Sequence, residues 1–218
     1  MLLLETERLV LRDFLLSDWD TINAIVSDPA VTRYMHFAAW DEEKRRNWFA
    51  WMIQETSNPQ RVRFNWAIVL RTTGLLIGWL LIGGDRNGTK EGTPGCGYAL
   101  DPTIWGQGYM TEALRAAFAY EFTVLGTQEI IADCATENVA STRAMQKSGM
   151  VYEGTFYVAD IFSLQVSYML LRRCLGRSAL RRQQKSLDES PLYGGEMHPA
   201  YAIMRVHRAS LLEVPRCA

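Results

Sequence analysis

The feature that most constrains the fold is a predicted strand that passes through a glycine turn directly into a helix. Cys96 to Leu100 is a short apolar stretch, and Tyr109 to Leu125 carries apolar residues at helical spacing. Gly106 and Gly108 stand between the two, where the chain has to turn. A strand joined to a helix in this way is a unit of α/β folds, so we expect a sheet with helices packed against it.

The rest of the chain extends this pattern. Ser17 is predicted to cap a helix that runs to Ser27, and Asp41 to begin a second helix. Phe64–Leu70 and Leu75–Ile82 are predicted to form a hairpin. Further strands are expected at 9–11, 130–135, 151–158 and 165–171, and a further helix at 138–148. The resulting order, βααβββαβαββ, predicts a mixed α/β fold.

The composition of the chain changes near Gly176. We predict one domain over residues 1–175 and a basic, then loop-rich, extension over residues 176–218. Within the extension, Ala200–Val206 is the one candidate strand. The arginine-rich run from Arg172 to Lys185 fits either a solvated helix face or a nucleic-acid patch. The formal net charge of −1 argues against nucleic-acid binding through bulk charge.

Composition also limits the classes of function. Hydrophobic residues make up 48% and charged residues 22%, as in ordinary globular proteins. The four cysteines have neither CxxC spacing nor a neighbouring histidine cluster, so we expect no metal site and no disulfide framework. The start of the chain does not have the pattern of a signal peptide, and no apolar run approaches the ~20 residues that span a bilayer. We therefore expect a cytoplasmic protein without membrane contact.

The turn at residues 105–109 is the first candidate for chemistry. The first N–H groups of a helix lack partners within the helix and lie at the positive end of its dipole. Glycines allow an anion to approach the backbone closely, so Gly106 and Gly108 predict a pyrophosphate bound by main-chain N–H groups. By itself the pattern also fits a turn required only for packing. It matches neither GxGxxG nor GxxxxGK[ST].

With its neighbours, the turn resembles that of the GNAT N-acetyltransferases. Trp105 to Ala113 reads WGQGYMTEA, close to the form found in the GNAT group that acetylates ribosomal-protein N-termini. The resemblance extends over residues 5–172. The other matching segments are Thr6–Arg12, Thr73–Gly78, Glu137–Ser141 and Lys147–Met150.

The resemblance implies a mixed sheet of about seven strands flanked by helices. Two parallel strands, Cys96–Leu100 and Ile130–Ala135, would splay apart to form the acetyl-coenzyme A cleft. The implied cofactor contacts are Tyr98, Ala99, Leu100, Trp105, Gly106, Gln107, Gly108, Tyr109, Met110, Thr111 and Asn138. The side chain of Met110 would have to point away from the phosphates. An amine acceptor would enter from the opposite side and attack the thioester directly.

The resemblance also implies catalytic residues, with two departures from the family. Met145 stands where many relatives have a tyrosine acid, and Gly95 where many have a glutamate. Ser141 is therefore our candidate proton donor and Asp160 our candidate base. Judged locally, Ser141 also fits a hydroxyl near a helix cap, Asp160 a turn residue, and Asn138 a plain helix cap.

The predicted function is acetyl transfer from acetyl-coenzyme A to a primary amine. A protein N-terminal amine is favoured, and a small-molecule amine is the second option. Trp40, Trp48 and Trp51 fit either the core or the wall of the acceptor site. Two other functions stay open at this stage, a non-catalytic acyl-coenzyme A binding protein and an adaptor that docks on RNA through its basic tail. A homodimer is also open.

Overall fold

The computed structural model describes residues 3–35, 40–85, 94–127, 129–157, 168–171 and 200–207. Within this part of the chain, nine strands form one sheet in the order β1-β2-β3-β4-β5-β6-β9-β7-β8. The strands are β1 (Leu3–Glu5), β2 (Leu9–Asp13), β3 (Arg63–Leu70), β4 (Leu76–Asp85), β5 (Pro94–Leu100), β6 (Glu129–Ala135), β7 (Val151–Tyr157), β8 (Tyr168–Leu171) and β9 (Ala200–His207). The helices are α1 (Trp19–Ser27), α2 (Pro29–Thr32), α3 (Glu42–Thr56), α4 (Tyr109–Thr123) and α5 (Val139–Lys147), with 3-10 turns η1 (Leu16–Asp18) and η3 (Pro102–Ile104).

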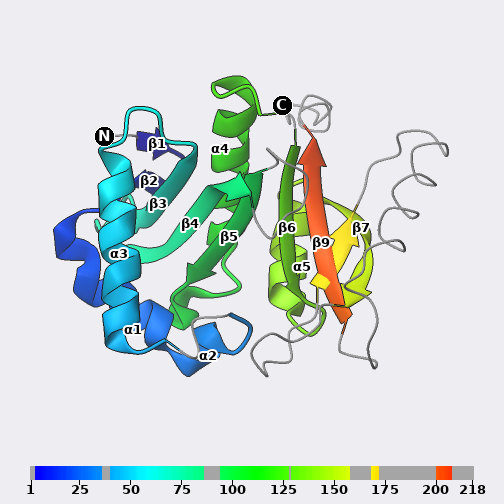
Figure 1. The fold of residues 1–218 in the computed structure, drawn as a ribbon, viewed down its shortest axis with the longest axis horizontal. Helices are drawn as coiled ribbons and strands as arrows, with labels where there is room; N and C mark the ends of the chain where they lie inside the picture. Colours follow the sequence, from blue (N-terminus) through cyan, green and yellow to red (C-terminus); the bar gives the residue numbers. More distant parts are fainter. Residues whose placement is uncertain are drawn as a thin grey trace.

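Two hydrophobic clusters divide the helices between the faces of the sheet. One cluster joins α4 and Met145 of α5 to one face of the strands, and it contains the buried Trp66, Leu80 and Phe118. The other joins α1, α2 and α3 to the opposite face. Figure 1 shows α1, α2 and α3 beside β1 to β5, and α5 beside β6. We call these two sides the α4 face and the α3 face.

The sheet opens between β5 and β6. These strands are parallel and pair at only two positions, Gly95 with Ile131 and Cys96 with Ala132. Beyond Cys96 the β6-facing edge of β5 has no strand partner among the described residues, and the two ribbons diverge in Figure 1. The expected mixed α/β architecture with two splayed parallel strands is therefore confirmed. The sheet has more strands than expected because β1 and β9 join it.

The start of the first helix differs from the prediction. Ser17 does not cap it, because residues 16–18 form the 3-10 turn η1 and Asp18 supplies the carboxylate there. That carboxylate accepts the N–H of Leu15 at 2.8 Å and pairs with Arg12 at 2.6 Å. A buried carboxylate that already binds a guanidinium is a stronger acceptor than a hydroxyl. Asp28 then ends α1 and caps the short helix α2, which the sequence did not predict.

The strand expected at Ala200–Val206 forms as β9, and it lies inside the sheet. It pairs antiparallel with β6 from Glu129 to Ala135 and with β7 from Val151 to Tyr157. The domain boundary near Gly176 stays a prediction. The position of β9 is relevant to this boundary, because a chain that ended at residue 175 would lack β9, the strand that pairs with both β6 and β7.

Candidate active site

A large cleft opens where β5 separates from β6, and residues from both faces of the sheet line it. Its volume is about 1310 Å³, and it is lined by the β1–β2 turn, α2, the end of β5, the glycine turn, α4 and α5. Of the predicted cofactor contacts, all but Gln107 line it. The splayed strands and the glycine turn thus face one continuous space.

The glycine turn presents backbone donors to this cleft. Gly106 and Gly108 have positive φ angles of 76° and 82°, which side chains rarely adopt. The Nε1–H of Trp105 donates to the carbonyl of Leu100 at 2.9 Å and fixes the turn against β5. Gly108 caps α4 without any side-chain hydrogen bond, and the first intrahelical bond is donated by Glu112. The N–H groups of residues 109–111 are therefore free to bind an anion.

A salt-bridged clamp holds the β1–β2 turn against the start of α4. The Glu112 carboxylate accepts from the Thr6 hydroxyl at 2.6 Å, from the Arg8 backbone N–H at 2.9 Å and from Arg8 Nε at 2.6 Å. Arg8 also donates to the carbonyl of Gln107 at 3.0 Å and lies over the ring of Tyr109 at 4.5 Å. The clamp thus places a guanidinium beside the glycine turn, where a phosphate would benefit from its charge. Sequence reasoning missed this role.

The clamp predicts a pH-dependent stability. Burial acts to raise the pKa of Glu112, but the hydrogen bonds from Thr6 and Arg8 and the charge of Arg8 outweigh it, so the pKa is lowered from 4.5. A lowered carboxyl pKa contributes stability above the unfolded value, and that stability is lost as pH falls through the folded value. At pH 7, Glu112→Gln should cost about 1 kcal/mol, or roughly 2–4 °C in Tm.

Thermal unfolding from pH 7 to pH 3 tests this expectation. The difference in Tm between wild type and Glu112→Gln should shrink below pH 4.5. Glu42→Gln is the matched control, because its pair with Arg46 is exposed and should contribute almost nothing. A difference that stays constant down to pH 3 would show that the charge of Glu112 is not what stabilises the clamp.

Two hydroxyl groups meet where β5 faces α5. Tyr98 Oη lies 2.7 Å from Ser141 Oγ and 3.2 Å from the Ser141 carbonyl oxygen. Burial holds the pKa of Tyr98 well above its ordinary value, although the hydrogen bond from Ser141 opposes the shift. Tyr98 therefore keeps its proton at neutral pH. When Tyr98 donates to Ser141 Oγ, the Ser141 proton is left to point into the cleft.

The neighbouring Cys134 thiol is a poor nucleophile. Burial raises its pKa to about 11, and its side chain is only 7% exposed. Cys96, the other described cysteine beside the splay, is buried as well. Because thiolates and not thiols attack thioesters, Cys134 does not suit a covalent acetyl-enzyme intermediate, and burial keeps Cys96 from a substrate. The site instead favours direct attack by the acceptor.

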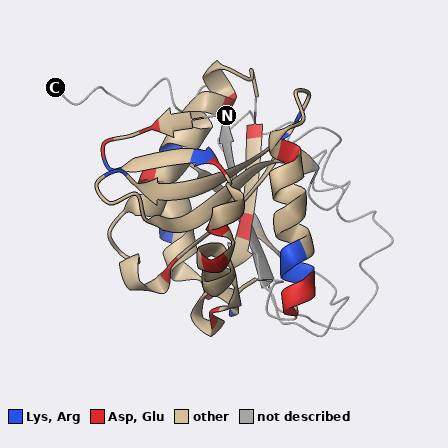
Figure 2. Ribbon diagram, turned by 90° about the vertical axis from the view of Figure 1, so that its left-hand side faces the viewer, with Lys and Arg blue, Asp and Glu red and all other residues tan. Residues whose placement is uncertain are grey.

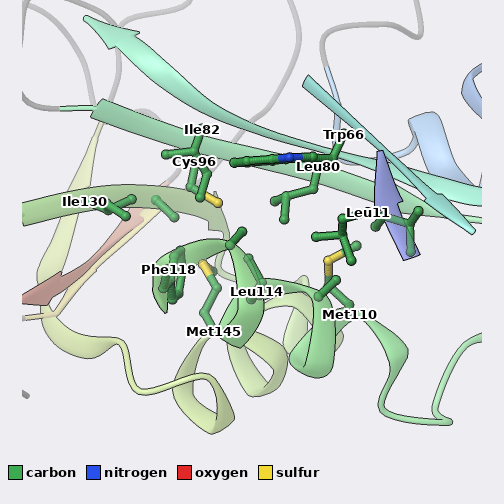
Figure 3. Packing of buried hydrophobic residues seen from close by; sticks show 14 of the residues in the cluster. Leu11, Trp66, Leu80, Ile82, Cys96, Met110, Leu114, Phe118, Ile130 and Met145 are labelled. Carbon is green, nitrogen blue, oxygen red and sulfur yellow. The ribbon is translucent and has the colours of Figure 1, made fainter. Parts of the chain in front are cut away.

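The two methionines of the predicted site both point into the core. Figure 3 shows Met110 beside Leu11, and Met145 beneath the sheet near Leu114 and Phe118. The buried side chain of Met110 points away from the cleft, as expected, and leaves its backbone N–H for a ligand. Met145 is fully buried and carries no proton to donate, so a donor has to come from another residue.

The other predicted residues divide into three cases. Asn138 caps α5 by accepting the N–H of Ser141 at 3.1 Å, and it also lines the cleft. Asp160 lies outside the described residues. Trp48 packs on Trp79 with ring centroids 5.6 Å apart, while Trp51 is partly buried against the same cluster. The predicted contacts of these side chains with a ligand stay predictions.

Three absences hold for the described residues. No helix among them is long and apolar enough to cross a membrane. No group of three or more His, Cys, Asp and Glu side chains in this part of the chain is suited to a metal ion. Figure 2 shows Lys and Arg positions interspersed with Asp and Glu positions, with no stripe of one sign along the described ribbon.

Comparison with known proteins identifies the family. A family model described as an acetyltransferase (GNAT) domain matches residues 8–151, about two thirds of the chain. The chain belongs to the GNAT acetyltransferase family. It is 30% identical over 151 residues to the uncharacterized N-acetyltransferase YnaD of Bacillus subtilis, covering 69% of this chain and 84% of that one. It is 32% identical over 152 residues to the uncharacterized N-acetyltransferase p20 of Bacillus licheniformis, covering 69% and 83%.

Solved structures show the same GNAT fold. A GNAT-family acetyltransferase from Bacillus anthracis gives a TM-score of 0.66 at 24% identity, covering 95% of this chain and 99% of that one. Spermidine N-acetyltransferase from Vibrio cholerae, in complex with CoA and spermine, gives 0.65 at 13% identity, covering 95% and 100%. Ribosomal-protein-S5-alanine acetyltransferase from Vibrio fischeri gives 0.59 at 16% identity, covering 95% and 97%.

Membership of the GNAT family defines the general reaction. Acetyl-coenzyme A is the co-substrate of this family, and the acetyl group goes to an amine. The cleft fits that co-substrate: free N–H groups at residues 109–111 suit a pyrophosphate, and the open edge of β5 suits the amide-containing arm.

Proposed function

We propose that this GNAT enzyme acetylates an α-amine, with a protein N-terminus as the favoured acceptor and a small-molecule amine as the second. The proposal rests on one observation, that residue 95 is a glycine and therefore has no side chain. That residue lines a small pocket on the α3 face, and none of the described residues that line this pocket carries a carboxylate. The position where related enzymes often carry a glutamate base therefore provides none.

The missing carboxylate favours acceptors that deprotonate readily. The attacking amine has to be neutral, and a side-chain ammonium with a pKa near 10.4 is almost wholly charged at pH 7. An α-amino group titrates near ~8, so it costs roughly 3 kcal/mol less to deprotonate. A site without a strong base at Gly95 should thus turn over α-amines faster than alkyl amines.

The proposed reaction balances without a covalent enzyme intermediate. The amine nitrogen forms a C–N bond to the thioester carbonyl carbon, and the C–S bond then breaks. The developing oxyanion would accept a hydrogen bond from a backbone N–H near Tyr98 or Ala99 on the open edge of β5. The surplus amine proton would pass to Asp160 directly or through water. The departing thiolate would take a proton from Ser141, with Tyr98 polarising that hydroxyl.

A thiol-release assay over three classes of amine tests the proposal. Short peptides with free N-termini, spermidine and an aminoglycoside would be compared at pH 7 with acetyl-coenzyme A saturating. We expect kcat/KM for the peptides to exceed that for spermidine by at least about tenfold, close to 1.4 kcal/mol in the barrier. A preference for spermidine would refute α-amine selectivity, and no release with any amine would refute acetyl transfer by this chain.

A further inference from the structure

The small pocket on the α3 face has a composition of its own. Its volume is about 180 Å³, enough for a group of a few heavy atoms. Its lining residues are Trp51, Arg63, Leu81, Gly83, Gly84, Gly95 and Gly97. Four glycines leave the strand backbones of β4 and β5 bare, and the charged and aromatic side chains come from β3 and α3. Glycine backbone therefore forms much of the pocket wall, and Arg63 is the one cationic side chain among the described residues that line it.

Arg63 is the cation, and it forms no salt bridge with another described residue. Its guanidinium lies over the ring of Trp51 at 5.7 Å, and none of the ion pairs among the described residues includes it. Arg61, two residues earlier, differs because it pairs with Asp13 at 2.8 Å. A guanidinium held on an aromatic ring keeps its N–H edge available for a carboxylate.

Asn65 adds an unsatisfied polar group on the same face. Only 3% of Asn65 is exposed, and neither Oδ1 nor Nδ2 has a hydrogen-bond partner among the described residues. Asn65 pairs in register with Leu81, which pairs with Gly97, so the three side-chain positions share the α3 face. Asn65 does not itself line the pocket, so the polar contact with an acceptor falls to Arg63.

The pocket lies beside the point where β5 and β6 separate. Gly97 is the first residue of β5 beyond Cys96, the last residue paired with β6. Gly97 lines the small pocket, and the next residue, Tyr98, lies on the opposite face of the strand and lines the cofactor cleft. An amine at the splay would therefore have the Ser141–Tyr98 pair on one side and the Arg63 pocket on the other.

From this arrangement we infer that the pocket selects acceptors that carry a carboxylate close to the reacting amine. Arg63 would donate to the carboxylate through the N–H groups of its guanidinium. The acidic end of the acceptor would then bind on the α3 face beside β5, while the cofactor occupies the cleft at the glycine turn. This inference rests on the proposed function and specifies its substrate.

The strand spacing limits the length of the acceptor. Arg63 on β3 is paired with Gly83 on β4, which is paired with Gly95 on β5. Two strand spacings make roughly 10 Å, and the arginine side chain covers part of that distance. The carboxylate should thus lie only a few bonds from the amine, as in an amino acid or an N-terminus followed by Asp or Glu.

Matched peptide acceptors test the inference. Two short peptide amides that differ only in Glu or Gln at the second position would be compared, with wild-type enzyme and with Arg63→Gln. We expect wild type to prefer the Glu peptide by at least about tenfold in kcat/KM. Arg63→Gln should remove that preference and leave acetyl-coenzyme A affinity unchanged. Arg46→Gln, on the exposed end of α3, should keep it.

The other outcomes test the inference and the proposed function separately. Equal rates in wild type for the Glu and Gln peptides and also for free alanine and alaninamide, or an equal loss for both members of each pair in Arg63→Gln, would overturn the inference while leaving acetyl transfer to amines intact. No thiol release with any acceptor would overturn the proposed function itself. Free alanine and alaninamide form a further arm, since a preference confined to free alanine would identify an amino acid as the source of the carboxylate.

Discussion

Replacing Ser141 with alanine is expected to lower kcat by about ten- to a thousandfold, with little change in acetyl-coenzyme A affinity. General acid catalysis by a positioned side chain contributes about a hundredfold or more, and a hydroxyl is a weak acid within that range. Ser141 meets the geometric requirement, since it lines the cleft and its hydroxyl oxygen lies 2.7 Å from that of Tyr98. A steady-state measurement of kcat, with calorimetric binding of the cofactor, checks both parts.

Two further variants separate chemistry from structure. Tyr98→Phe should cost less than Ser141→Ala, and the double variant should cost little more than Ser141→Ala alone if the two hydroxyls act as one unit. Ser148→Ala is the matched control, because that serine lies at the other end of α5 and donates to the carbonyl of Met145. Asp160→Asn should lower kcat over the same range if Asp160 is the base.

If Ser141→Ala turns over at the wild-type rate, Ser141 is not the proton donor. Holding a neutral amine in position beside the thioester would then account for the whole mechanism. The pH profile provides an independent check. The raised pKa of Tyr98 means that this group does not lose its proton near neutral pH, so a rise in rate between pH 6 and pH 9 would report the acceptor amine or its base.

Sequence reasoning predicted those parts of the site that depend only on residues close to one another along the chain. The glycine turn, the start of α4 and the cap of α5 by Asn138 are local, and their backbone requirements can be read from residue types. The reactivity of Ser141 could not be read in this way. Its environment comes from Tyr98, 43 positions earlier in the chain.

The same limit explains the contacts that sequence reasoning missed. Glu112 reaches Thr6 and Arg8 across more than a hundred residues, and neither partner carries a local signal of a clamp. The pocket at Arg63 depends on the register of three strands, and a slip of one residue would move Arg63 to the other face. Capping by Ser17 was predicted from residue type alone, and it failed because Arg12 orients Asp18.

Replacing Gly108 with valine is expected to weaken acetyl-coenzyme A binding by at least tenfold, about 1.4 kcal/mol. Gly108 has a φ of +82°, and a Cβ placed there would lie 3.5 Å from Arg8 Nη2. The methyl groups of valine would extend from that Cβ toward the guanidinium and into the cleft. They would thus occupy the space in which a phosphate has to approach both Arg8 and the first N–H groups of α4.

Gly74→Val separates this steric effect from backbone strain. Gly74 has a similar φ of +69° with open space around its Cβ, and it lies in the β3–β4 hairpin and is not among the residues that line the cleft. Both variants should lose a similar amount of stability, about 1–2 kcal/mol for a side chain in the left-handed region. Only Gly108→Val should lose cofactor affinity in calorimetry. If folded Gly108→Val binds as wild type does, the phosphates lie elsewhere; if both variants lose affinity equally, the effect is one of stability and the glycine turn is not the cofactor site.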